Sequence, residues 1–161
     1  MQADVLDDMA TAQYLTFELS GEVYGVDILK VQEIKGWEPV REMPNTPNYI
    51  RGMLDLRGVM VPIVDLRARF GLDDVEYTAV TVVIVLSIAG AQSTQVMGIV
   101  ADAVSDVLDV KPGKIQPNPD LGPIVDTRYM KGMVLGKPTV MLLDVDKLLD
   151  PSDFSTVEVR N

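Results

Sequence analysis

The sequence contains neither cysteine nor histidine. The absence of cysteine excludes disulfide bonds and thiolate chemistry, and the absence of histidine removes the most common general base and transition-metal ligand. The chain also lacks a Walker-type phosphate loop and a GxGxxG dinucleotide fingerprint, and without histidine it cannot form a serine–histidine–aspartate triad. We therefore predict that the protein is not an enzyme, has no catalytic residues and uses no cofactor.

Positive charge is scarce as well. The 161 residues include 14 Lys and Arg but 24 Asp and Glu, which gives a net charge of −10. Nucleic-acid binding requires cationic side chains that displace phosphate counterions, so this balance argues against nucleic acid and against anionic membrane surfaces. The most apolar run, Val80 to Ala91, is shorter than the roughly 17–25 residues of a membrane-spanning helix. The acidic N-terminus does not resemble a signal peptide, and we expect a cytoplasmic protein without direct membrane insertion.

Short strand-like runs occupy most of the chain. Tyr14 to Leu19 alternates apolar and polar residues, and a turn at Ser20-Gly21-Glu22 separates it from a second extended run, which predicts a hairpin. Further runs rich in β-branched residues have the length of strands: Val59–Asp65, Thr81–Leu86, Val96–Val100 and Thr139–Leu143. Together with frequent Pro and Gly, this pattern favours an all-β barrel or sandwich. It leaves open whether Thr81–Leu86 is a central strand or an edge.

Helical signals are short and similar in the two halves of the chain. Asp65 and Asp144 each precede about one turn of helix-compatible residues, in the position of an N-cap. Both aspartates end a matching segment, because Val61–Asp65 corresponds to Val140–Asp144.

Two more blocks repeat in the same order. Tyr49–Met53 matches Tyr129–Met133, and upstream of it Gly25, Val31, Ile34 and Pro44 align with Gly98, Val104, Val107 and Pro117. We infer two pseudo-symmetric β units within a domain at 13–151, with halves at roughly 13–72 and 78–151. A flexible acidic N-terminus (1–12) and a C-terminal tail (152–161) flank them.

One group of acidic residues is a candidate metal site. Asp102, Asp106 and Asp109 would share one face of a helix and offer oxygen ligands to a hard cation. The valines between them indicate a strand with solvated carboxylates instead, and the spacing is not that of an EF-hand. We therefore expect no metal site.

The segment Val31 to Trp37 is a candidate for a partner-facing surface. If it is extended, Val31, Glu33, Lys35 and Trp37 project from one side. An aliphatic residue, two opposite charges and the only tryptophan form the kind of mixture found at protein interfaces. The alternative is an ordinary half-buried strand in which Trp37 covers the core.

A second candidate lies at Leu54–Val59. Here Leu54 and Leu56 are expected to point inward, Asp55 and Arg57 outward, and Gly58 can adopt a positive φ at low cost. The second repeat has no arginine at the position of Arg57. Arg57 is therefore either a functional residue or one half of a local salt bridge, with Glu33 as its expected partner.

Two longer motifs carry a resemblance to a known family. The first is Tyr24-Gly25-Val26-Asp27-Ile28-Leu29-Lys30-Val31-Gln32-Glu33-Ile34, and the second is Leu56-Arg57-Gly58-Val59-Met60-Val61-Pro62-Ile63-Val64-Asp65-Leu66. Both look like the CheW coupling proteins. The match continues through Thr81–Val85, Gly98–Val100 and Val104–Leu108. It covers nearly the whole chain, from about Tyr14 to Leu149. The sequence departs from the family at Asp55, where asparagine is common, and this adds a negative charge beside Arg57.

The resemblance implies a fold, a function and partners. CheW-like proteins consist of two pseudo-symmetric SH3-like β-barrels and are non-enzymatic adaptors. They couple the cytoplasmic tip of chemoreceptors to the regulatory domain of the histidine kinase CheA, in arrays at the membrane. The resemblance places Glu33 and Arg57 at positions tied to receptor coupling, with Val31 and Ile28 nearby. We add neighbouring residues to this predicted partner-binding set: Lys35, Asp55 and Gly58.

Other functions remain open at this stage. The protein is alternatively a CheW-type scaffold of a pathway that does not control flagella. A small-ligand-binding β-barrel is a further alternative, because barrels can hold ligands in their interior or mouth. A carboxylate-dependent hydrolase would depend on the aspartate group alone.

Overall fold

The computed structural model describes residues 11–42, 47–71, 76–89, 93–117 and 127–149. The predicted C-terminal tail, and all but the last two residues of the predicted flexible N-terminus, lie outside these ranges. None of the helices within the ranges has the length and apolar character needed to cross a membrane.

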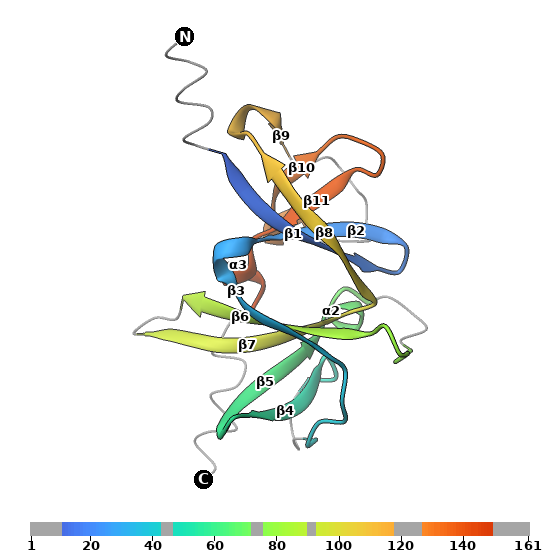
Figure 1. The fold of residues 1–161 in the computed structure, drawn as a ribbon, viewed down its shortest axis with the longest axis vertical. Coiled ribbons are helices and arrows are strands. Elements are labelled where there is room, and N and C mark those ends of the chain that lie inside the picture. The colour runs from blue at the N-terminus through green and yellow to red at the C-terminus, as the bar shows by residue number, and fades with distance from the viewer. Residues whose placement is uncertain (1–10, 43–46, 72–75, 90–92, 118–126, 150–161) are drawn as a thin grey trace.

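The described residues form two β-sheets, which lie one above the other with short helices between them (Figure 1). Sheet A has the order β8-β1-β2-β11-β10-β9, and its strands are β1 (Ala12–Leu19), β2 (Glu22–Asp27), β8 (Ala103–Val110), β9 (Ile115–Gln116), β10 (Met130–Val134) and β11 (Val140–Leu143). Sheet B has the order β3-β6-β7-β5-β4, and its strands are β3 (Val31–Gly36), β4 (Ile50–Leu56), β5 (Val59–Asp65), β6 (Val82–Ala89) and β7 (Thr94–Ala101).

The helices within the described residues are all short. The α-helices are α2 (Leu66–Arg69) and α3 (Val145–Leu148), and the 3-10 turns are η1 (Ile28–Lys30), η2 (Pro112–Lys114) and η3 (Thr127–Tyr129). The predicted caps are confirmed: the Asp65 side chain accepts a hydrogen bond from the backbone N–H of Arg67, and Asp144 accepts one from Lys147. The predicted all-β fold with short helices is confirmed.

Each sheet takes strands from both halves of the sequence. The β1–β2 hairpin of the first half pairs in sheet A with β8 and β11, and the β6–β7 hairpin of the second half pairs in sheet B with β3 and β5. The sequence halves 13–72 and 78–151 therefore do not correspond to the two sheets. The segment 31–101 builds sheet B, and the segments on either side of it build sheet A. The chain crosses between the sheets at η1 and again at Asp102.

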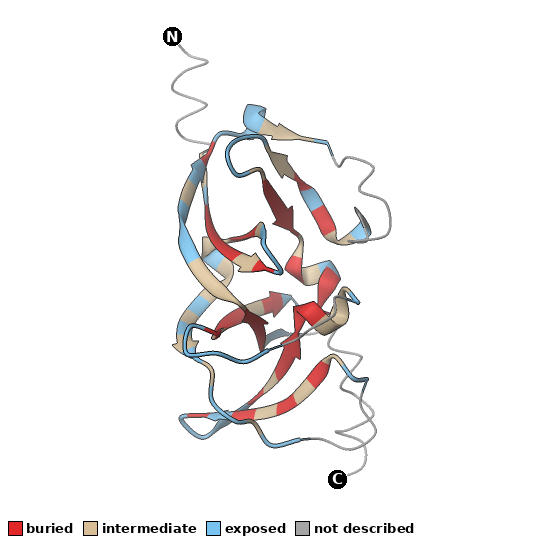
Figure 2. Ribbon diagram, turned by 90° about the vertical axis from the view of Figure 1, so that its right-hand side faces the viewer, coloured by how far each residue is buried: buried red, intermediate tan, exposed pale blue. Residues whose placement is uncertain are grey.

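One hydrophobic core extends across both sheets. Its largest cluster contains Phe17 and Tyr24 from sheet A together with Ile84 and Ile99 from sheet B, all with no exposed surface. Buried positions line the inner sides of the strands and the region between the sheets (Figure 2). Since β6 pairs with both β3 and β7, the apolar run that we left unplaced is an internal strand and not an edge.

Candidate partner-binding surface

The side chains of strand β3 point alternately to its two sides, as the sequence predicts. Val31, Glu33 and Lys35 are half-buried, and the residues between them are exposed. The strand lies at one edge of sheet B, where it pairs with β6. One side of β3 therefore packs toward the barrel, and the other, with Ile34, faces solvent.

The β4–β5 connection is a two-residue turn formed by Arg57 and Gly58. Their φ angles are +53° and +87°, and positive values at both central positions are typical of the type I′ turns that suit the twist of β-hairpins. The Asp55 carboxylate accepts a hydrogen bond of 2.8 Å from the Gly58 N–H. Leu54 and Leu56 are buried on the inner side of the strand, so the predicted directions of these side chains are confirmed.

The structure brings Arg57 and Glu33 together in an ion pair between Arg57 Nη2 and Glu33 Oε1. Two backbone hydrogen bonds between Arg41 and Met53 bring the chain that follows β3 close to β4. The ion pair therefore spans the seam at which the two edges of sheet B meet. The Arg57 side chain remains 74% exposed while that of Glu33 is 28% exposed, so the guanidinium group can contact a partner without leaving Glu33.

The other predicted residues lie along the same stretch of chain. Ile28 is in η1, where it is half-buried and packs against the shared core together with Val31. Lys35 makes an ion pair of 3.4 Å with Glu38. Of the seven predicted residues, the structure thus joins Glu33 to Arg57 and Asp55 to Gly58, and it places the rest on η1 and β3.

Trp37 follows β3 and stacks on Tyr77, with ring centroids 4.1 Å apart and an angle of 15° between the planes. It also packs against the core of sheet B. Trp37 is thus the half-buried core cover that we gave as the alternative to a partner contact. Its stacking partner lies in a loop far along the sequence, and no local pattern signals this contact.

A buried ionic network lies next to this stacked pair and was not predicted. Asp65 has no exposed surface and accepts hydrogen bonds from Arg67 Nε (3.0 Å) and Nη2 (2.9 Å), and from the Tyr77 hydroxyl (2.9 Å). Burial alone would raise the pKa of Asp65, but these bonds and the Arg67 charge outweigh it and lower the pKa. Desolvation acts to lower the pKa of Arg67, but hydrogen bonds and charge from its carboxylate partners outweigh this effect and raise the pKa.

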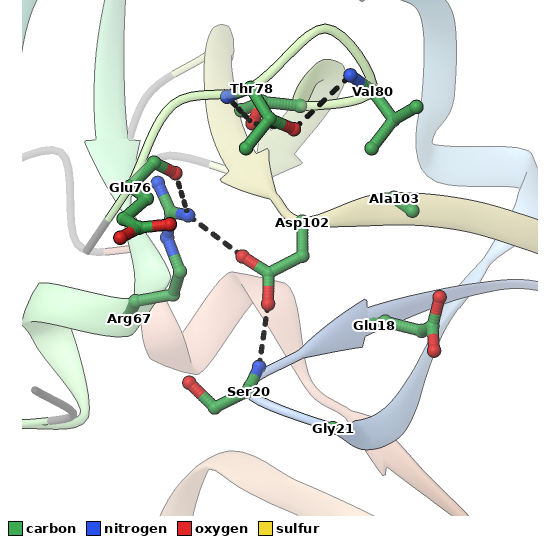
Figure 3. A pocket seen from close by; sticks show the side chains of 10 residues that line it. Glu18, Ser20, Gly21, Arg67, Glu76, Thr78, Val80, Asp102 and Ala103 are labelled. Atoms are coloured by element: carbon green, nitrogen blue, oxygen red, sulfur yellow. Dashed lines mark hydrogen bonds and ion pairs between the residues drawn. The ribbon is translucent and has the colours of Figure 1, made fainter. Parts of the chain in front are cut away.

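Arg67 also lines a cleft of about 550 Å³ between the two sheets (Figure 3). Its Nη1 donates to Asp102 Oδ1 (2.7 Å) and to the Glu76 carbonyl (2.6 Å). Asp102 Oδ2 in turn accepts a hydrogen bond of 2.7 Å from the backbone N–H of Ser20. Arg67 and Asp102 thus bind one another across the cleft, which is a junction between elements of the fold.

The three aspartates considered as a metal site are distributed along an extended segment. Asp106 and Asp109 lie on β8, as the strand interpretation predicts, and Asp102 immediately precedes the strand. Asp109 accepts a hydrogen bond from Gln13, whereas Asp102 pairs with Arg67. Their side chains therefore serve separate contacts.

Comparison with known proteins agrees with this geometry. A family model of the CheW-like domain matches residues 13–152. The chain belongs to the CheW-like family. It is 44% identical over 147 residues to the chemotaxis protein CheW of Klebsiella aerogenes, covering 91% of this chain and 86% of that protein. It is 34% identical to CheW of Rhizobium meliloti, with 88% of each chain covered.

A solved CheW structure has the same fold. The scaffolding protein TtCheW from Thermoanaerobacter tengcongensis superposes with a TM-score of 0.77 at 28% identity, covering 86% of this chain and 88% of that one. The predicted CheW-like fold and the predicted membership of this family of chemotaxis adaptors are confirmed. TtCheW is described as a scaffolding protein, and the residues of this chain that bind each partner stay a prediction.

Proposed function

We propose that this CheW-like protein is a non-enzymatic adaptor that couples chemoreceptors to a CheA-type histidine kinase. One partner is the cytoplasmic tip of the receptor, and the other is the regulatory domain of the kinase. The protein acts in the cytoplasm and is recruited to receptor arrays at the membrane. Its receptor-coupling surface consists of η1, β3 and the tip of the β4–β5 hairpin.

The Arg57–Glu33 ion pair is the observation that carries this proposal. It joins the hairpin tip to β3, so that residues 24 positions apart form one surface. Arginine is enriched at the energetic centres of protein interfaces, and Arg57 is largely exposed although it is paired. Half-buried Ile28 and Val31 supply apolar area on the adjoining segment.

An adaptor changes kinase activity only if it interacts differently with the active and inactive states of its partners. A surface that combines an exposed guanidinium group with apolar side chains suits this task. The charge makes the contact sensitive to the orientation of the receptor, and the apolar area contributes binding free energy. In this proposal the surface transmits receptor conformation by binding, and the adaptor itself performs no chemistry.

The direct test is kinase autophosphorylation with a purified CheA-type kinase and receptor cytoplasmic fragments, with and without this protein. We expect receptor-dependent activation only when the protein is present, and no ATP turnover by the protein alone. Co-sedimentation with each partner separately provides the binding control. The proposal is wrong if the protein binds neither partner and leaves kinase activity unchanged.

A further inference from the structure

In the part of the chain that the structure describes, two junctions have a carboxylate that binds both a cation and a backbone N–H at the end of a hairpin. The first is the cleft of Figure 3, where Asp102 binds Arg67 of α2 and the N–H of Ser20, at the end of β1. This junction connects a helix, a crossing between sheets and the β1–β2 hairpin.

The second junction lies between α3 and η1. Asp146 Oδ2 of α3 forms an ion pair of 2.9 Å with Lys30 Nζ of η1, and Asp146 Oδ1 accepts a hydrogen bond of 2.9 Å from the N–H of Ala89, the last residue of β6. It therefore connects a helix, the other crossing between sheets and the β6–β7 hairpin.

The two junctions are equivalent in the repeat but have opposite polarity. Arg67 and Asp146 each occupy the second position after a capping aspartate, so they are equivalent helix positions. Asp102 and Lys30 lie in the two segments that cross between the sheets. The carboxylate is on the crossing segment in one junction and on the helix in the other. Because the connection is the same although the charges are reversed, the geometry is a property of the fold and not of one repeated residue.

We propose that Lys30 and Asp146 are positioning residues that hold η1, and with it Ile28 and Val31, in the orientation that receptors bind. This inference rests on the proposed function, because it concerns the same surface. A single 3-10 turn has little stability of its own, and η1 is held locally by hydrogen bonds from Leu29 N–H to Asp27 and from Val31 N–H to the Ile28 carbonyl. The ion pair adds a bond from η1 to α3, far along the chain. The end of the domain thus contributes to the receptor-facing surface without touching the receptor.

The test uses three variants: Lys30→Met, which retains most of the aliphatic stem, Asp146→Asn, which retains an oxygen acceptor for the Ala89 N–H, and the double variant. Asp109→Asn is the matched control, because it makes the same substitution at an exposed carboxylate whose hydrogen bond comes from the neutral side chain of Gln13. The first measurement is hydrogen exchange at the Leu29 and Val31 amides, which does not depend on any partner. We expect faster exchange in all three variants but not in the control.

The second measurement is the affinity for a receptor cytoplasmic fragment and, separately, for the kinase regulatory domain. We expect each single variant to weaken receptor binding about five-fold, the order of a partly exposed ion pair, and the double variant to lose no more than either single one. Kinase binding should not change.

Unchanged hydrogen exchange would overturn the inference whatever the partners do. Equal losses for both partners would also overturn it, because they indicate general destabilisation, and additive losses would show that the two residues do not act as a pair. If hydrogen exchange changes as expected but the wild-type protein binds no receptor fragment, the proposed function is wrong while the junction between η1 and α3 is confirmed.

Discussion

Gly98 of β7 lies opposite Ile63 of β5 in a parallel pair, and a β-carbon on Gly98 would lie only 2.7 Å from Ile63 Cδ1. The equivalent pair in sheet A is Gly25 and Leu142, where the corresponding distance is 3.1 Å. In both pairs a strand from one half of the sequence packs against a strand from the other half. The two glycines therefore mark the places where the repeats exchange hairpins.

Gly98→Ala should destabilise the protein by about 1–3 kcal/mol, the usual effect of overpacking a dense core. The added methyl group would also lie 2.9 Å from Val83 Cγ1. Gly25→Ala should have a smaller effect, because its contacts are longer. Urea unfolding measures both, and Gly36→Ala is the control because a β-carbon there would meet nothing within 4 Å. Equal unfolding free energies for the three variants would contradict the close-approach argument.

Arg57→Glu should abolish receptor-dependent kinase activation while changing the unfolding free energy by less than about 1 kcal/mol, since an exposed ion pair contributes little stability. The substituted carboxylate would face Glu33 and present the wrong charge to a partner. The exchange variant Glu33→Arg/Arg57→Glu restores the ion pair and decides what the pair does. Restored activation would assign it a structural role, and continued loss would assign Arg57 a partner contact. A folded Arg57→Glu variant that activates normally would refute the site assignment.

Arg67→Met should destabilise the protein by about 3 kcal/mol, the lower end of the usual cost of breaking a buried ion pair. It removes the closer of two cations from the fully buried Asp65 carboxylate and leaves Arg51 Nε at 3.7 Å. Chemical denaturation followed by circular dichroism measures the loss. The double variant Asp65→Asn/Arg67→Met should recover part of it, since the buried charge is then absent. If Arg67→Met destabilised the protein no more than a substitution at an exposed position, the Asp65–Arg67 ion pair would not stabilise the fold.

Asp65 should also make the free energy of unfolding depend on pH in the acidic range. Its pKa in the folded protein lies below the ordinary value of 3.8, so its contribution is complete above that value and is lost as the pH falls through the lowered folded pKa. The difference in unfolding free energy between the wild type and Asp65→Asn should therefore be constant near neutral pH and shrink below about pH 4. A difference that stays constant into strong acid would show that the carboxylate is not preferentially ionised in the folded state.

Tyr24→Phe should leave stability unchanged or raise it by up to about 1 kcal/mol. The Tyr24 hydroxyl is buried without a hydrogen-bond partner in the described part of the chain, and an unsatisfied buried polar group is costly. Burial, aided by Glu22, raises the pKa of this hydroxyl to about 12. The ring itself stacks between Phe17 and Phe70 and would remain. Thermal unfolding measures the change, and a clear loss of stability would reveal a hydroxyl partner.

Local features of the fold could be predicted from the sequence because they depend on neighbouring residues. Alternation along β3 decides which side chains face inward, Asp65 and Asp144 cap their helices, and Arg57-Gly58 forms a tight hairpin turn. The repeat identified equivalent segments in the same way. The sequence offered the Glu33–Arg57 pair as one of two interpretations of Arg57, and the structure forms this pair.

The exchange of hairpins was decided only by the tertiary structure. The strands that accept β1–β2 and β6–β7 are equivalent in the two repeats, so a local pattern cannot distinguish pairing within a half from pairing across halves. Pairing across halves buries Phe17 and Ile99 in one core shared by both sheets. The same is true of the junctions, where Arg67 reaches Asp102 and Lys30 reaches Asp146 over long stretches of sequence. The sequence by itself determined the strands, the caps and the family, because these follow from residues close together along the chain; which strands and charges meet was decided by the packing of the whole molecule.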